Sequence, residues 1–243
     1  MVALVPVRRG GRLYHLFPAR MTQLSPMTSE AVICQAWEAM RDRVEIKKDL
    51  EFAHEHTLQF HFAWEVARVT GFGGNLEVRF EFRTEAPKPR GVIQTDLIFW
   101  TDPEFRIAVE LKAPIRSKKG ANSAMTHGRM AFYKDIDRLR YLVETPASNV
   151  RMGFFLAVVN ELGYVTHRQQ HTNLEYNTFH ETQVEGGITI PPTPGRNGCP
   201  YHLQMPFHPI CWKWDCENRE GRIFPASKMR HYWLAPISVS PPF

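Results

Sequence analysis

Residues 107–114, IAVELKAP, place two charged side chains inside an otherwise apolar run. Such a run is typical of a β-strand, in which alternate side chains point to opposite faces. Glu110 and Lys112 are therefore expected on one face, with Val109 and Leu111 on the other. A carboxylate and an amine together on a strand face bound for the interior indicate a functional site.

A second strand, VIQTDLIFW, and the turn TDPEF come just before this stretch. If the hairpin is centred on Pro103, Asp96 lies opposite Glu110. By the same register Gln94 lies opposite Lys112. Directly opposed residues share a face and have side chains close enough to interact. One face of the sheet is thus predicted to carry all four polar residues.

Two opposed carboxylates repel each other unless a positive charge lies between them. Mg²⁺ takes oxygen ligands, commonly one or two carboxylates together with waters and substrate phosphates. Asp96 and Glu110 are therefore expected to hold Mg²⁺, for which Mn²⁺ can substitute, with the carbonyl of Leu111 as a further ligand. The metal would activate a water, and Lys112 would orient it or stabilise charge on the phosphate. The alternative is a surface carboxylate pair bridged by a lysine.

Helix and strand patterns surround this hairpin. Helices are predicted over residues 28–46, capped by Ser29, over about 49–70 and over 129–145, and strands over 75–85, 92–100, 106–115 and 150–161. The order is helix, three strands, helix and strand. Residues 1–27 are expected to form an irregular N-terminal arm, and residues 166–243 an irregular C-terminal extension for DNA recognition or dimerisation.

The segments TDLIFW and IAVELKAP resemble the core motif of the PD-(D/E)xK nuclease superfamily. In that family an Asp lies in one strand and Asp/Glu-x-Lys in the next, and Asp96, Glu110 and Lys112 match these positions. The proline of the motif is absent, since Thr95 precedes the aspartate. The element order over about residues 45–165 resembles the family's αβββαβ core. The resemblance implies a restriction-endonuclease-like α/β fold, a mixed sheet flanked by helices, with residues 28–165 as the nuclease core.

The family often adds a glutamate from the helix before the first strand. Glu51, Glu55 and Glu65 are the candidates here. Helical spacing places Glu55 on the apolar face, with Gln59 one turn further on, so Glu55 is preferred as the fourth catalytic residue. Glu65 is the reserve. The alternative for each is a salt-bridged surface glutamate.

Basic residues flank the predicted site. The loop RSKK and the helix GRMAFYKDIDRLRYL carry Arg116, Lys118, Lys119, Arg129, Lys134, Arg138 and Arg140. Phosphate contacts supply much of the affinity for nucleic acid. The residues predicted to bind it are therefore Arg116, Lys118, Lys119, Arg129, Lys134 and Arg138. The family's helix often contributes a Lys or Gln to the site, and Lys134 is the candidate. The alternative is a solvated helix face on which Asp135 and Asp137 pair with these cations.

The C-terminal region contains a cluster of cysteines and histidines. CPYHLQMPFHPICWKWDC holds Cys199, His202, His208, Cys211 and Cys216. Thiolate and imidazole groups at such spacings can bind Zn²⁺. A structural zinc on Cys199, His202, Cys211 and Cys216 is one interpretation. The other is buried thiols and ordinary histidines beside a Trp-rich core, because the spacing matches no standard zinc finger.

Composition narrows the class of protein. The 243 residues are 43% hydrophobic and 23% charged, as in soluble globular proteins, and the net charge of +5 favours an acidic partner such as nucleic acid. No apolar run is long enough to span a membrane, and the N-terminus lacks the pattern of a secretory signal. With four cysteines, this predicts a cytoplasmic protein with free thiols.

The resemblance implies a Mg²⁺-dependent DNA endonuclease acting in restriction or defence. A Holliday-junction resolvase, a repair nuclease and a transposon-end nuclease are alternatives on the same fold. Two other classes stay open: a non-catalytic nucleic-acid-binding module, and a metal-independent sugar hydrolase that uses Asp96 and Glu110 as acid and base. Cutting both strands of a duplex requires two sites, so a homodimer is expected.

Overall fold

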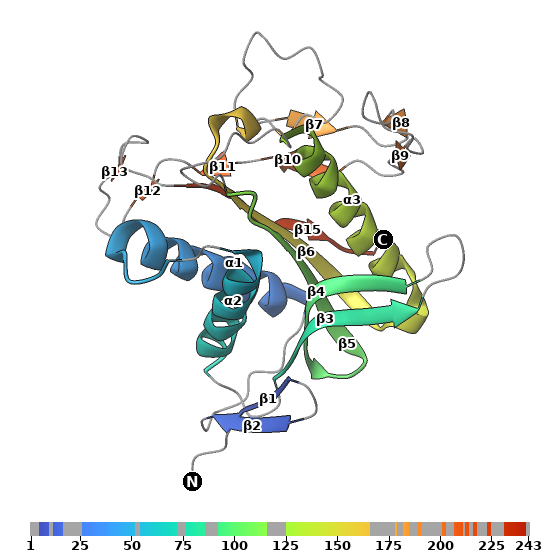
Figure 1. Ribbon diagram of the computed structural model, residues 1–243. Coiled ribbons are helices and arrows are strands. Elements are labelled where there is room, and N and C mark those ends of the chain that lie inside the picture. The colour runs from blue at the N-terminus through green and yellow to red at the C-terminus, as the bar shows by residue number, and fades with distance from the viewer. Residues whose placement is uncertain are drawn as a thin grey trace.

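The computed structural model describes residues 5–9, 12–16, 26–51, 54–71, 76–85, 92–115, 125–165, 178, 182–184, 189–190, 201–202, 207–210, 212–213, 216–217, 223–224 and 231–241. A mixed central sheet forms the middle of the fold and helices cover both of its faces (Figure 1). The predicted α/β class, with a mixed sheet flanked by helices, is therefore confirmed.

The central sheet contains seven of the described strands. They are β3 (Glu77–Glu85), β4 (Val92–Asp102), β5 (Phe105–Lys112), β6 (Val150–Val159), β11 (Trp212–Lys213), β14 (Tyr232–Leu234) and β15 (Ile237–Val239). The order is β11-β14-β6-β5-β4-β3, and β15 also pairs with β6. Helix α3 (Met125–Glu144) connects β5 to β6, which run parallel, whereas the other neighbours are antiparallel.

Two N-terminal helices cover one face of the sheet. Helix α1 (Pro26–Arg41) begins at its proline, before the predicted cap Ser29, because the fixed φ of proline suits the first helical turn. It continues into the π-helix η1 (Asp42–Lys47), after which Lys48 adopts a left-handed φ of 57°. This turn delays α2 (Glu55–Val69), which starts later than the predicted residue 49.

The β4–β5 hairpin has the predicted register in its paired part. Leu97 pairs with Val109, and the pairing continues to Trp100 and Arg106 before an irregularity at the turn. The β4–β5 ladder ends at Leu97, although β4 continues to pair with β3 beyond it. The two strands that carry the predicted site therefore stop pairing where Asp96 begins the polar stretch.

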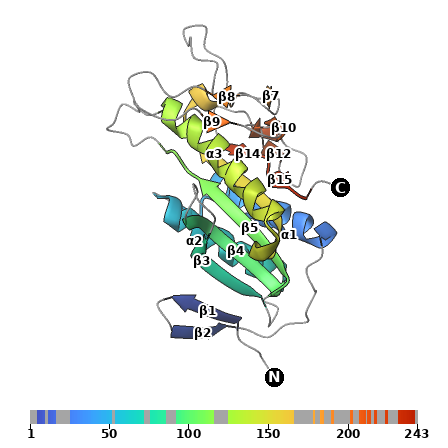
Figure 2. The ribbon, with the colours of Figure 1, turned by 90° about the vertical axis from the view of Figure 1, so that its right-hand side faces the viewer.

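Two apolar cores lie on opposite faces of the sheet, as Figure 2 shows by the placement of α3 against that of α1 and α2. On the α1 and α2 side, Trp37 lies edge-on to Phe62 at 5.9 Å and to Trp233 at 4.8 Å between ring centroids. On the α3 side, Phe132 contacts Phe155 and Tyr164. Full burial of each such side chain contributes about 2 kcal/mol, so these two layers supply much of the stability.

The C-terminal strands belong to the central sheet rather than to an irregular extension. β14 and β15 both pair with β6. The indole of Trp233 donates to Glu45 in η1 at 3.0 Å, and that of Trp37 donates to the carbonyl of Leu234 at 2.8 Å. The strands were missed because each is three residues long and flanked by proline or polar residues, too short for a periodic signal.

The N-terminal region is also more regular than predicted. β1 (Val5–Arg9) and β2 (Arg12–Leu16) form an antiparallel hairpin, which lies beside β3 (Figure 1). The remaining described elements are β7 (Thr182–Val184), β8 (Thr189–Ile190), β9 (Tyr201–His202), β10 (Phe207–Ile210), β12 (Cys216–Glu217), β13 (Ile223–Phe224), η2 (Pro146–Ser148) and η3 (Leu162–Tyr164). Within the described ranges, no helix has the length and apolar character needed to cross a membrane.

Candidate functional site

The candidate site lies at the end of the sheet where β4 and β5 stop pairing. The structure brings together there Asp96 of β4, Glu110 and Lys112 of β5, Glu55 at the start of α2, and Asp135 and Arg138 of α3. The four residues predicted to be catalytic thus lie close together, joined by Asp135 and Arg138 of α3.

Lys112 is the centre of this cluster. Its Nζ lies 3.2 Å from Glu55 Oε1, 3.2 Å from Asp135 Oδ2 and 3.9 Å from Asp96 Oδ2. Burial opposes the charged amine, but the negative charges of Asp135, Asp96 and Glu55 outweigh it and raise the pKa of Lys112. Lys112 is therefore a permanent cation at neutral pH, suited to stabilising negative charge and unsuited to accepting a proton.

Glu110 is fully buried and only partly satisfied. Its Oε1 accepts a hydrogen bond from Arg138 Nη1 at 2.9 Å, whereas its Oε2 is buried with no hydrogen-bond partner. Burial, and then the charges of Asp135 and Asp96, raise the pKa of Glu110 well above its usual range. An unsatisfied buried carboxylate oxygen carries a desolvation cost of about 1–3 kcal/mol, which a bound cation would relieve.

Asp96 faces the same cluster from β4. Its Oδ2 accepts the backbone N–H of Leu111 at 2.7 Å, so the carboxylate bridges the strands where their ladder has ended. Burial raises the pKa of Asp96 to about 6, although the charge of Lys112 and this hydrogen bond both act to lower it. The nearby positive charge therefore does not offset the cost of burying Asp96 as an anion.

Asp135 and Arg138 complete the cluster from α3. Arg138 Nη2 lies 2.9 Å from Asp135 Oδ1, and Asp135 is 2% exposed. Burial raises the pKa of Asp135 despite the nearby charges of Lys112 and Arg138. The sequence held a signal for this residue, since Asp135 shares the apolar helix face of Phe132 and Leu139 at spacings of three and four.

The charges of the cluster do not balance. Four carboxylates face two cations, which leaves a net charge of −2 when every group is ionised. Protons or a divalent cation can supply the missing positive charge. Carboxylate oxygens and the nearby carbonyl of Leu111 are the hard ligands that Mg²⁺ prefers. Among the described residues, no three His, Cys, Asp or Glu side chains already surround a common point as metal ligands do.

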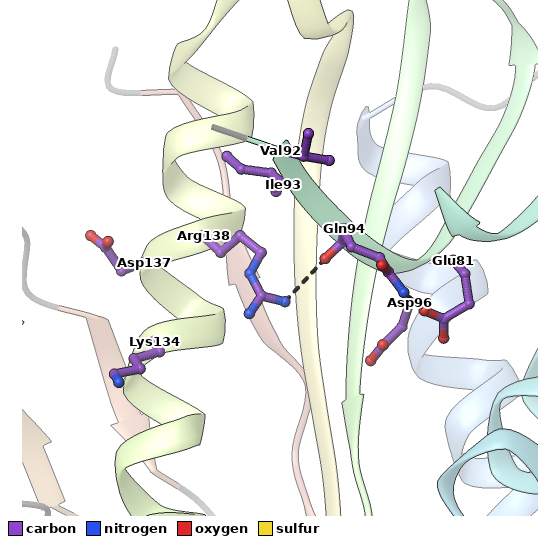
Figure 3. A pocket seen from close by; sticks show the side chains of 8 residues that line it. All are labelled: Glu81, Val92, Ile93, Gln94, Asp96, Lys134, Asp137 and Arg138. Carbon is purple, nitrogen blue, oxygen red and sulfur yellow. Dashed lines mark hydrogen bonds between the residues drawn. The ribbon is translucent and has the colours of Figure 1, made fainter. Parts of the chain in front are cut away.

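A groove of about 480 Å³ opens beside the cluster. It is lined by Glu81, Val92, Ile93, Gln94, Asp96, Lys134, Asp137 and Arg138 (Figure 3). Arg138 reaches from α3 to the carbonyl of Gln94, to which Nη1 donates at 3.1 Å. The Gln94 amide in turn donates to the carboxylate of Glu81. The groove thus leads from solvent to the Asp96 carboxylate, between helix α3 and the first residues of β4.

Glu81 in the groove wall has a strained backbone. Its φ of 50° is left-handed, which is uncommon for a residue other than glycine and costs about 1–3 kcal/mol. Phe80, before it, packs in the core under α1 and α2, whereas Phe82, after it, packs in the core under α3. The pattern LEVRFEFRTE did not predict this reversal, because it alternates like an ordinary strand.

The reserve candidate Glu65 pairs with residues outside the cluster. Glu65 is buried between Arg43 at 3.0 Å and Arg68 at 2.6 Å, so it ties α2 to η1 as a structural ion pair. Gln59 lies within α2 and is buried. Glu55 is the glutamate that contacts Lys112, in agreement with its predicted place, and its second oxygen accepts the N–H of Ala113 at 3.1 Å.

The predicted phosphate-binding residues have four different outcomes. Arg129 is 4% exposed and donates to the carbonyl of Gly163, so it does not face solvent as that role requires. Lys134 is exposed and lines the groove. Arg138 lines it too but is engaged by Glu110. Arg116, Lys118 and Lys119 lie outside the described residues.

The zinc interpretation stays a prediction. Cys199 and Cys211 lie outside the described residues. His202 lies in β9 and Cys216 in β12, and these strands belong to separate two-stranded sheets. The backbone therefore does not place these two predicted ligands in one sheet.

Comparison with known proteins adds no relative. No family model, no curated protein and no solved structure matches the chain. The functional argument therefore depends on the residues, contacts and charges of the site.

Proposed function

We propose that this chain is a Mg²⁺-dependent DNA endonuclease of the PD-(D/E)xK superfamily, with a restriction-endonuclease-like fold. The observation that carries the proposal is the excess of carboxylates around Lys112, beside a groove that reaches the Asp96 carboxylate. Asp96, Glu110 and Lys112 occupy the motif positions, and Glu55 joins them from the preceding helix. The mixed sheet with helices on both faces is compatible with the proposed fold.

Asp96 and Glu110, with the carbonyl of Leu111, would hold the Mg²⁺ ion, for which Mn²⁺ can substitute. When bound, this ion supplies a water of lowered pKa and positive charge for the scissile phosphate. The unpartnered Oε2 of Glu110 and the raised pKa of Asp96 are the features that fit a cation here.

The side chains around these ligands have separate roles. Lys112 stays protonated and stabilises negative charge on the phosphate as the water attacks. Glu55 positions the Lys112 amine at 3.2 Å and is itself held by the N–H of Ala113. Lys134, exposed on the groove wall, would contact the phosphate backbone and align the strand.

The proposal extends to the setting of the enzyme. Restriction or defence against foreign DNA is the proposed use, with a Holliday-junction, repair or transposon-end nuclease as the alternatives of the same class. Cleavage of both strands requires two sites, so a homodimer is part of the proposal, as is a cytoplasmic location.

A non-catalytic nucleic-acid-binding module is the second candidate. The observation that favours it is the 2.9 Å pair between Arg138 and Glu110, because a guanidinium already neutralises part of the carboxylate charge. In this case the cluster would serve structure, and Lys134 on the groove wall would bind phosphate without hydrolysis.

Cleavage of supercoiled plasmid separates the two candidates. The native chain is incubated with Mg²⁺ or with EDTA, beside Lys112→Ala, Asp96→Asn and the control Lys47→Ala, which removes an exposed lysine at the end of η1. We expect nicked or linear product that requires Mg²⁺, survives in the control and is lost in both site variants. Asp96→Asn keeps the shape of the site, so its loss of activity does not depend on misfolding. If plasmid, branched DNA and RNA all give no product, the nuclease is refuted and the non-catalytic binding module is retained.

A further inference from the structure

Helix α2 carries an exposed ridge of aromatic and basic side chains. His56, Phe60, Trp64 and Arg68 follow one another at spacings of four, so they are neighbours along one side of the helix. All four are exposed, and none is a carboxylate. The opposite side of α2, with Leu58, Phe62 and Val66, is buried against the sheet. We refer to these four residues as the α2 ridge.

The apolar content of this ridge is unusual for an exposed surface. Phe60 is 55% exposed and Trp64 36%. In the part of the chain that the structure describes, the only other large apolar side chain with comparable exposure is Val92, which lines the groove. Apolar side chains gathered on one exposed face, rather than scattered singly, are typical of an interaction site.

The ridge begins where the groove ends. Glu55, which directly precedes it, contacts Lys112 at 3.2 Å. His56 Nε2, its first member, lies 3.9 Å from Oε1 of Glu81, and Glu81 lines the groove. From His56 to Arg68 the helix rises by roughly 18 Å. A strand leaving the groove past Glu81 would therefore continue along the ridge.

We propose that the α2 ridge is a stacking platform for unpaired nucleotides, so that the substrate carries a single-stranded segment next to the point of cleavage. This inference rests on the proposed function and names its substrate class. Bases stack on aromatic side chains irrespective of sequence, because every base has a flat face. Phe60 and Trp64 supply the rings, while Arg68, held by Glu65 at 2.6 Å, supplies positive charge at the far end. An intact duplex keeps its base faces stacked and would not use these rings.

Binding to a single strand tests the proposal without requiring cleavage. The probe is a fluorescein-labelled thymidine oligonucleotide of about 12 nucleotides, measured by anisotropy in EDTA beside a duplex of equal length. The variant is Phe60→Ala with Trp64→Ala, and its matched control is Phe60→Tyr with Trp64→Phe, which keeps both ring faces. Each lost stacking contact is worth about fivefold or more, so the alanine pair is expected to weaken single-strand binding by about 25-fold or more. The control is expected to bind like the native chain.

The outcomes separate this inference from the proposed function. Unchanged single-strand affinity in the alanine pair, with equal melting temperatures, overturns the stacking platform even if the native chain cleaves plasmid. A change from dimer to monomer on size-exclusion chromatography, with oligonucleotide binding intact, also overturns it and assigns the ridge to a second copy of the chain. Single-strand binding that depends on Phe60 and Trp64 supports the stacking platform. If the native chain shows this binding but cleaves no DNA or RNA, the proposed nuclease activity is refuted and the binding surface is retained.

Discussion

Replacement of Asp96 by asparagine is expected to stabilise the metal-free protein at alkaline pH while abolishing cleavage. Burial raises the pKa of Asp96 from its ordinary 3.8 to about 6, so the folded state binds this proton more tightly than the unfolded state. Below pH 3.8 both states are protonated and the residue contributes no pH dependence. As the pH rises towards 6, the unfolded state loses its proton first and stability falls, and above 6 the whole cost is present.

The size of this effect follows from the shift of about two pKa units. At 1.36 kcal/mol per unit, the ionised carboxylate costs the folded state about 3 kcal/mol. Asparagine removes the charge and keeps an oxygen that can accept the Leu111 N–H, now made at 2.7 Å by Asp96 Oδ2. Asp96→Asn should therefore recover up to about 3 kcal/mol at about pH 8 and close to nothing near pH 4.

Urea unfolding in EDTA measures this at the two pH values. The matched control is Asp102→Asn, in the β4–β5 turn, where asparagine can still accept the N–H of Glu104. We expect the control to change stability by the same small amount at both pH values. If Asp96→Asn destabilises the protein equally at both, the carboxylate is held favourably as an anion, and the argument from excess negative charge is refuted.

Three further results are expected from the same contacts. Lys112→Ala should destabilise the protein by about 3 kcal/mol in urea unfolding, because it leaves buried carboxylates without their cation, whereas the exposed-lysine control Lys47→Ala should not. Mg²⁺ should raise the melting temperature of the native chain at about pH 8, because a ligand that binds only the folded state stabilises that state. The melting temperature of Asp96→Asn should not change with Mg²⁺. Equal shifts in the two proteins would show that the cation binds at another site. Glu81→Gly should stabilise the fold by about 1 kcal/mol, because glycine adopts a φ of 50° without strain, and a loss of stability would show that the Glu81 carboxylate outweighs its backbone cost.

The sequence could predict the hairpin because its information is local. The turn around Pro103 sets the register, and the register sets which side chains share a face, so Asp96 and Glu110 could be placed together. The rotation of α3 against the sheet depends on packing across the whole core. Arg138 was therefore predicted to contact phosphate, whereas the structure pairs it with Glu110. For the same reason, β14 and β15 are defined by pairing with the distant β6 and leave little trace in their own residues.

Three departures from the rules of stable folding meet at one end of the sheet. Glu110 Oε2 is buried without a partner, Asp96 is an anion in a site that favours its neutral form, and Glu81 has a left-handed backbone. Each costs the fold on the order of 1–3 kcal/mol. A network needed only for stability could be replaced by apolar residues at no loss. Because these three costs lie close to one groove, they support a site built to bind positive charge together with a phosphate.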